Sequence, residues 1–160
     1  MSARRRPEAA CGAISPALLR AYRATAYVAA GAVVRIGRRS DAMDALLVRA
    51  GSRQGVFVTA WNPLSRRMPE GWNRRMQLCL AARLRRCVCV PAEGSLRRWH
   101  EAHLLVLGNP RPVLRLARVF RQCGVVVVAR GQPARLVLLE RWRPAPLVPP
   151  GRWSPGYARR

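Results

Sequence analysis

The chain has 160 residues, half of them apolar, and this composition excludes global disorder. Its 30 basic residues, all of them Arg, outnumber seven acidic residues and give a formal net charge of +23. No apolar run approaches the ~18 residues of a membrane span, and the three arginines at 4–6, followed by Glu8 and Pro16, make a poor signal peptide, so we expect a soluble, cytoplasmic protein without a membrane partner.

The first half of the chain predicts two helices and two strands. Ser15 followed by Pro16 is typical of a helix start. Residues 27–36 are rich in β-branched side chains and predict a strand. A second helix is expected from Ser40 to about Gly51, because apolar residues recur at i, i+3, i+4 and i+7 between them. Residues 55–60 form a short apolar run between turn signals, which is typical of a buried central strand.

The second half predicts two more helices and four more strands. The longest helix is expected from about 69 to 86, and a short strand at 87–90 follows it. Residues 91–99 are expected to form a loop that leads into a buried strand at 103–108. Another helix is expected from about 112 to 124, with a row of Arg on its outward side. Strands at 125–129 and 136–139 complete the pattern as a pair.

These elements predict one small α/β domain at residues 14–140. Strands interleaved with helices favour a mixed sheet of about five to six strands flanked by three to four helices, with the last two strands antiparallel. Residues 1–13 have the composition of a flexible basic arm. Residues 141–160 contain five prolines and five arginines, which is typical of a flexible extended tail.

The most unusual segment is Thr-Ala-Trp-Asn-Pro-Leu-Ser at 59–65, between the buried strand and the long helix. Ligand sites in α/β sheets gather outside the carboxyl ends of strands. Trp61 offers a stacking plane, Ser65 offers a hydroxyl, and Asn62 offers an amide on backbone that the following proline favours as extended. The segment is therefore either a capped turn that fixes the strand-to-helix connection or part of a polar ligand site.

Asn73 lies eleven positions after Asn62 in a chain that contains only three asparagines. On the long helix it falls between the angles of Leu80 and Leu84, so its side chain is expected to point inward. An unpaired amide is costly in such a position. We therefore expect a hydrogen-bonded network that joins the 59–65 loop to the start of the long helix.

Four blocks follow one another along the chain: Ala-Tyr-Arg-Ala-Thr-Ala-Tyr at 21–27, the 58–65 segment with Asn73 behind it, Glu-Ala-His-Leu-Leu-Val-Leu-Gly at 101–108, and Arg-Val-Phe-Arg-Gln at 118–122. Together they resemble the bacterial family catalogued as domain of unknown function 3293, over roughly residues 18 to 139. The Thr-Ala-Trp-Asn-Pro-x-Ser block is the most specific signature. The resemblance implies a small bacterial protein with no established activity, cofactor or partner, and it singles out Trp61, Asn62, Pro63, Ser65, Asn73, Glu101 and Gln122.

Two segments depart from the pattern of that family. Gln122-Cys123 stands where the family usually has Gln-Asn, and residues 91–100 replace an expected Gly/Asp-rich loop. We therefore assign no ligand role to the 91–100 loop.

The other residues that could carry chemistry have structural explanations. Asp41 and Asp44 suit the first turn of a helix, and for Glu101 we favour an Arg-paired surface position over a buried acid or base. His100 and His103 lack the i, i+4 helical spacing of a zinc site. The five cysteines are expected to be reduced and mostly buried, so we predict neither a metal nor a cofactor.

The Arg excess has two explanations. A GC-rich coding bias supplies Arg where other chains have Lys, and this chain has no Lys. The bias does not explain the shortage of acids, because residues 14–140 still hold 22 arginines against six acidic residues, a net charge of +16. Binding to the backbone of RNA or DNA therefore stays open beside a simply solvated basic surface.

We expect a small polar-ligand-binding domain with its site at the 59–65 loop, and we leave open whether it catalyses a reaction. The predicted site consists of Trp61, Asn62, Ser65, Asn73, Glu101 and Gln122. The alternative is nucleic-acid binding through the Arg-rich surface. A third hypothesis, a protein-interaction module in the 141–160 tail, rests on composition alone.

Overall fold

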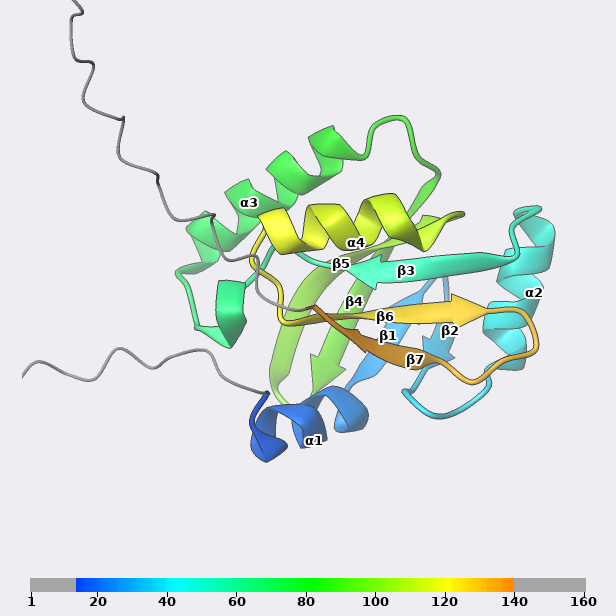
Figure 1. Cartoon of the computed structure of the whole chain (residues 1–160), viewed down its shortest axis with the longest axis horizontal. Coiled ribbons are helices and arrows are strands. Elements are labelled where there is room, and N and C mark those ends of the chain that lie inside the picture. Colours follow the sequence, from blue (N-terminus) through cyan, green and yellow to red (C-terminus); the bar gives the residue numbers. More distant parts are fainter. Residues whose placement is uncertain (1–13, 140–160) are drawn as a thin grey trace, which may run out of the picture.

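A computed structural model describes residues 14–139 (Figure 1), so the expected arm at 1–13 and tail at 141–160 lie outside the described residues. Its elements are, in chain order, α1 (Pro16–Ala24), β1 (Ala26–Ala29), β2 (Ala32–Val34), α2 (Asp41–Arg49), β3 (Gln54–Val58), a short 3-10 turn η1 (Pro63–Ser65), α3 (Glu70–Arg83), β4 (Cys89–Leu96), β5 (Trp99–Leu107), α4 (Pro110–Val119), β6 (Gly124–Ala129) and β7 (Arg135–Leu138). The predicted α/β class is confirmed, and the four α-helices of residues 14–139 agree with the expected three to four.

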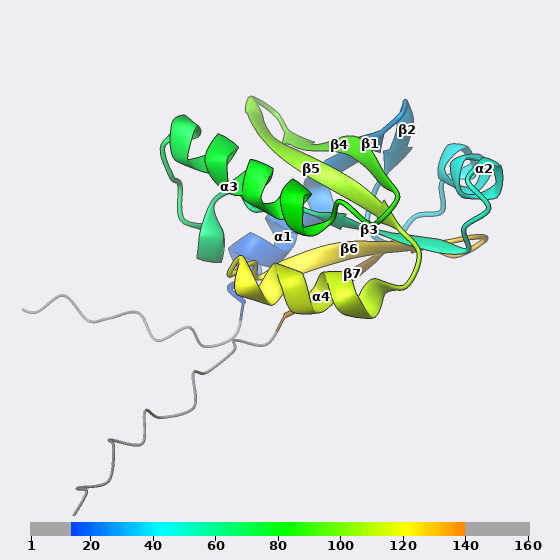
Figure 2. The ribbon, with the colours of Figure 1, turned by 90° about the horizontal axis from the view of Figure 1, so that it is seen from above.

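All seven strands belong to one sheet, in the order β2-β1-β4-β5-β3-β6-β7. Every strand pair is antiparallel, so the expected mixed sheet of five to six strands is corrected to an antiparallel sheet of seven. Tight hairpins join β1 to β2 and β4 to β5, and a longer hairpin loop at residues 130–134 joins β6 to β7; a hairpin makes its two strands antiparallel. One isolated parallel bridge, Ile36 to Ala134, connects the two edges of the sheet and curls it toward closure (Figure 2).

Two segments differ from the prediction because turns interrupt them. The expected strand at 27–36 is the β1–β2 hairpin, whose turn residues Ala30 and Gly31 have φ angles of 46° and 79°. Positive φ at both central residues is what a type I′ turn requires. The expected loop at 91–99 is instead β4 and its turn, in which Arg97 has φ 55°. β4 contains a proline and a glycine, which are rare inside strands, so the sequence concealed it.

One end of the concave face of the sheet is filled by α2 (Figures 1 and 2). The buried residues of this helix, Met43, Leu46 and Leu47, pack with inward side chains of β1, β2, β3, β5 and β6. Ser40 caps the helix as predicted, because its Oγ accepts from the Met43 backbone N at 3.3 Å. Asp44 lies in the first turn of the helix as expected, and it accepts from Arg39 Nε at 2.9 Å.

The convex face is covered by α3 and α4 (Figure 2). Strand residues alternate between the two faces, so Phe57 belongs to the concave core whereas Val56 and Val58 belong to the convex one. Leu80 of α3 and Ala117 of α4 are fully buried against the convex face. The outward sides of both helices carry exposed arginines together with exposed Leu78 on α3 and Val119 on α4.

The cysteines occupy less buried positions than expected. Cys79 and Cys87 are exposed, Cys89 and Cys123 are half-buried, and all four are unpaired. Cys79 lies on the outer side of α3, away from buried Leu80, so the prediction of a mostly buried set is wrong for the described cysteines. Among residues 14–139, no helix is long and apolar enough to cross a membrane.

Candidate functional site

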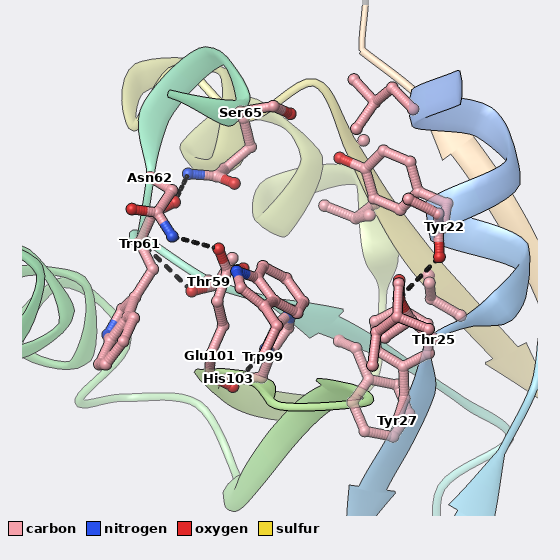
Figure 3. A pocket seen from close by; sticks show the side chains of 18 of the residues that line it. Tyr22, Thr25, Tyr27, Thr59, Trp61, Asn62, Ser65, Trp99, Glu101 and His103 are labelled. Atoms are coloured by element: carbon pink, nitrogen blue, oxygen red, sulfur yellow. Dashed lines mark hydrogen bonds between the residues drawn. The ribbon is translucent and has the colours of Figure 1, made fainter. Parts of the chain in front are cut away.

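A pocket of about 330 Å³ lies on the concave face, at the end that α2 does not fill (Figure 3). This volume falls within the range of small-ligand sites. The wall opposite the sheet is α1, which begins at the predicted Ser15 cap and has no buried residue. The side chains that give the pocket its chemistry are Tyr22, Thr25, Tyr27, Thr59, Asn62, Ser65, Arg67, Trp99, Glu101, His103 and Gln122.

Two asparagines bind each other behind the pocket. Asn62 donates its backbone N–H to Asn73 Oδ1 at 2.9 Å, and Asn73 Nδ2 donates to Asn62 Oδ1 at 3.0 Å. Met68 also donates its backbone N–H to Asn62 Oδ1, at 2.8 Å. Because Asn62 Oδ1 accepts these two bonds, its amide orientation is defined and Nδ2 faces the pocket. The predicted network between the loop and the long helix is confirmed, and Asn73 is buried as predicted.

Thr59 and Gln77 hold the end of β3 beside the pocket. Thr59 Oγ1 donates to the Ala102 carbonyl oxygen at 2.7 Å and accepts from the Trp61 backbone N at 3.0 Å. Gln77 Oε1 accepts from the Ala60 backbone N at 2.9 Å. These bonds tie the loop to β5 and to α3.

The 62–65 loop has an unusual backbone. Asn62, Leu64 and Ser65 all have positive φ, at 47°, 56° and 57°. The expectation that Pro63 keeps Asn62 extended is therefore wrong, because Asn62 adopts the left-handed conformation. Non-glycine residues rarely adopt this region, and its cost is tolerated where surrounding contacts determine the conformation. Here Leu64 N donates to the Arg121 carbonyl at 2.8 Å, and Gln122 Nε2 donates to the Trp61 carbonyl at 3.0 Å. The segment of Arg121 and Gln122 therefore holds the loop, which carries Asn62 into the pocket wall.

Glu101 is the acidic group of the pocket, and it is only 7% exposed. Its Oε1 accepts from Asn62 Nδ2 at 2.6 Å. Burial raises the pKa of Glu101 to about 7, and the hydrogen bond from Asn62 opposes that rise. The expectation of an Arg-paired surface carboxylate is therefore wrong: position 101 faces the concave side of β5, and no cation reaches it within residues 14–139.

This lack of a cationic partner sets Glu101 apart from the other described acids. Asp41 and Asp44 lie within 4 Å of Arg39, Glu70 pairs with Arg74, and Glu93 lies 3.0 Å from His100. All four make these contacts at the protein surface, whereas the one buried carboxyl, which needs a partner most, has an amide and an open pocket instead.

His103 lies two residues further along β5, on the same side of the strand. Its Nδ1 is 3.0 Å from the Glu101 carbonyl oxygen, which can only accept, so Nδ1 carries the proton. Burial lowers the pKa of His103 to about 4, so the ring is neutral at pH 7. Gly94 on β4 makes room for this ring, because a Cβ there would lie 2.8 Å from His103 Cε1.

Aromatic rings form much of the remaining wall. Tyr27 meets Phe57 and His103 with ring centroids 5.7 and 5.6 Å apart. Burial also raises the pKa of Tyr22 and of Tyr27, so both phenols stay protonated. In Figure 3 the ring of Trp99 lies beside Glu101, whereas the ring of Trp61 extends away from Tyr22.

The six predicted site residues lie together, although their positions differ. Five of them line the pocket, and Asn73 supports Asn62 from behind. Ser65 is exposed and donates to Cys123 Sγ at 3.7 Å, and Gln122 holds the loop backbone. Trp61 lines the pocket, and its backbone N–H and carbonyl bond to Thr59 and Gln122.

Sequence reasoning missed Tyr22, Trp99 and His103. The alternation of residues 99, 101 and 103 along one strand was the available signal, but the expected loop at 91–99 hid it. Among residues 14–139, no three His, Cys, Asp or Glu side chains lie close enough to hold a metal ion.

A family model described as "Protein of unknown function (DUF3293)" matches residues 58–125. This range begins at the last residue of β3 and ends inside β6, so it contains Asn62, Asn73, Glu101 and Gln122. No curated protein and no solved structure matches the chain. The chain resembles this family over the segment that builds the polar side of the pocket, and the resemblance brings no activity with it.

Proposed function

We propose that this protein binds a small ligand in the pocket between α1 and the sheet, with Glu101 as the principal recognition group. The observation that carries the proposal is a buried carboxyl with no cationic partner that opens into an aromatic pocket. Apolar walls with a few converging polar groups are typical of small-molecule sites. The ligand therefore has an apolar or flat body and a polar group that reaches Glu101.

The charge of the chain strengthens this interpretation. Residues 14–140 hold 22 arginines, so a carboxylate with a purely structural role could readily be paired with one of them. A buried, perturbed titratable group in a cleft is a candidate functional group, although structural networks also perturb pKa values. The competing interpretation is that Asn62, Asn73 and Glu101 only fix the loop.

A bulky side chain that fills the pocket tests the proposal directly. The probe is Nile red, an uncharged aromatic dye that fluoresces in apolar sites. Ala21 lines the pocket from α1, whereas Ala17 is exposed one turn earlier on the same helix. We expect Ala21→Trp to weaken saturable probe binding about tenfold and Ala17→Trp to leave it unchanged. Equal affinities for the two variants would contradict the proposal.

Nucleic-acid binding is the second candidate, because the expected Arg row on α4 is present. Arg111, Arg115 and Arg118 are exposed, and no acidic side chain pairs with them among the described residues. Exposed arginines also occur on other surfaces, including Arg35 and Arg53, so the charge is not gathered on one surface. The Arg row on α4 is therefore not set apart from the general Arg excess of the chain.

Salt dependence decides between the two candidates. Phosphate-backbone binding weakens steeply with salt. A fluorescent RNA or DNA oligonucleotide should lose its binding near physiological salt if the charge is background. Binding that persists there, and that fails when Arg111, Arg115 and Arg118 are all replaced by Ala, would support the nucleic-acid function.

We also propose that the protein binds its ligand in the cytoplasm of a bacterial cell. The four described cysteines are unpaired, and reduced thiols suit that compartment. The bacterial source rests on the family resemblance. Cell fractionation with an antibody to the chain would test the location, and recovery outside the cytoplasmic fraction would contradict it.

A further inference from the structure

The hydrogen-bonding groups of the pocket define a more specific ligand, on the premise that the pocket binds a small molecule at all. We infer that the ligand is a planar nitrogen heterocycle with two hydrogen-bond donors side by side on one edge, as in a guanine-type ring. Three features support this inference: the unused acceptors on β5, their spacing, and the rings beside them.

The first acceptor is Glu101 Oε2. Asn62 Nδ2 occupies the other carboxyl oxygen, Oε1, at 2.6 Å. Oε2 has no partner within residues 14–139, yet it is not among the enclosed unpartnered atoms of that range, which are Trp61 Nε1 and Gln77 Nε2. Oε2 is therefore open to the pocket and, when Glu101 is ionised, can only accept a hydrogen bond.

The second acceptor is His103 Nε2. Because Nδ1 donates to the Glu101 carbonyl, a neutral ring leaves a lone pair on Nε2. Nε2 has no partner in the described residues and is likewise not enclosed. The two acceptors therefore come from neighbouring positions on one face of β5, with Cα atoms roughly 6.6 Å apart along the strand. A ligand that pairs with both side chains therefore carries two donors directed at the same face of β5.

The rings around these acceptors favour a flat ligand. Trp99 is two residues before Glu101 on the same face of β5, and its ring lies beside the carboxyl in Figure 3. Tyr22 reaches the pocket from α1 on the opposite wall. A heterocycle between such walls stacks on aromatic faces while its edge reaches the acceptors. A carboxylate ligand would instead place its charge against Glu101.

Arg67 also lines the pocket, and the protein as a whole is strongly basic. It could bind a phosphate attached to the heterocycle. The same donor edge occurs in a free nucleoside and in a nucleotide, so the experiment includes both.

Calorimetric titration with matched probes tests the inference. Guanosine monophosphate carries the ring N–H and the amino group, and inosine monophosphate has the same charge but lacks the amino group. We expect guanosine monophosphate to bind about tenfold more tightly. Both nucleotides carry the same phosphate, so binding of that phosphate to surface arginines contributes equally to the two affinities and does not affect their ratio. Guanosine, which lacks the phosphate, distinguishes a nucleoside ligand from a nucleotide ligand. If guanosine keeps the affinity of guanosine monophosphate, the ligand is a base or nucleoside. If guanosine loses that affinity, the ligand is a nucleotide.

Substitutions test which residue causes the preference for guanosine monophosphate over inosine monophosphate. Glu101→Gln should abolish the difference between the two nucleotides, whereas Glu93→Gln, on the exposed face of neighbouring β4, should preserve it. Equal binding of the two nucleotides to the unaltered protein would overturn the inference, and this comparison requires no variant. If Ala21→Trp still blocks the fluorescent probe in that case, the proposed pocket function survives. If that variant also has no effect, both fail.

Discussion

The two ends of the concave sheet face show how one fold makes both a core and a site. At the α2 end, Leu47 is fully buried among apolar side chains. At the α1 end, Thr59, Glu101 and His103 project from the same face, and α1 buries no residue. Phe57 lies on β3 and Thr59 directly follows its last residue, so the change from core to pocket occurs at the end of one strand.

Backbone geometry alone does not distinguish the α2 end of the concave face from the α1 end. Both use the same alternation of side chains along β3 and β5. Their difference lies in what the helix supplies: α2 supplies Leu and Met that fill the space, whereas α1 leaves a cavity. Substitutions at the two ends should therefore have very different effects on stability.

The largest effect is expected at the α2 end. Leu47→Ala should lower the free energy of unfolding by about 3 kcal/mol, because it removes a fully buried side chain from a close-packed region. Urea denaturation of the purified protein measures this loss. A change below about 1 kcal/mol would show that this end is not well packed.

Asn73→Ala should come next, with a loss of about 2 kcal/mol. The substitution leaves the Asn62 backbone N–H without its acceptor and Asn62 Oδ1 with one donor fewer. Asn109→Ala is the matched control, because Asn109 caps α4 at an exposed position by accepting from Arg111 N at 3.0 Å. The control should lose about 1 kcal/mol or less. Equal losses would contradict the buried network.

The sequence predicted this network better than it predicted the pocket. An inward angle on a helix and the cost of an unpaired amide were enough to link Asn73 to Asn62. Glu101 was assigned to the surface because nothing local shows that its side of β5 is covered by α1, a helix far away in the chain. Trp99 was missed for a related reason, since β4 holds a proline and a glycine that disguise the hairpin.

The pH dependence of stability should separate Glu101 from His103. Glu101 has a raised pKa, so its stabilising contribution is lost as pH rises from about 4.5 to about 7. His103 has a lowered pKa, so stability is gained as pH rises from about 4 to about 6.5. The two effects oppose each other in the unaltered protein. In Glu101→Gln the His103 effect should emerge as a rise of up to about 3 kcal/mol over that interval.

Chemical denaturation at several pH values measures both slopes. Parallel curves for the variant and the unaltered protein would contradict the assignment of a perturbed pKa to Glu101.

The smallest effect is expected at the α1 end. Leu18→Ala should cost less than about 1 kcal/mol, because Leu18 is half-buried and already faces a cavity. Comparison with Leu47→Ala under the same conditions measures the contrast between the ends. A loss as large as that of Leu47→Ala would mean that α1 closes a second core.

The most direct test of the central claim is the free energy of unfolding of Glu101→Gln at pH 8. If Glu101 serves a ligand, its ionised form is buried at a cost in the free protein, and the neutral amide can still accept from Asn62 Nδ2. We expect the variant to be as stable as the unaltered protein or about 1–2 kcal/mol more stable. A loss comparable to that of Asn73→Ala would show that Glu101 holds the fold together and would contradict a ligand site.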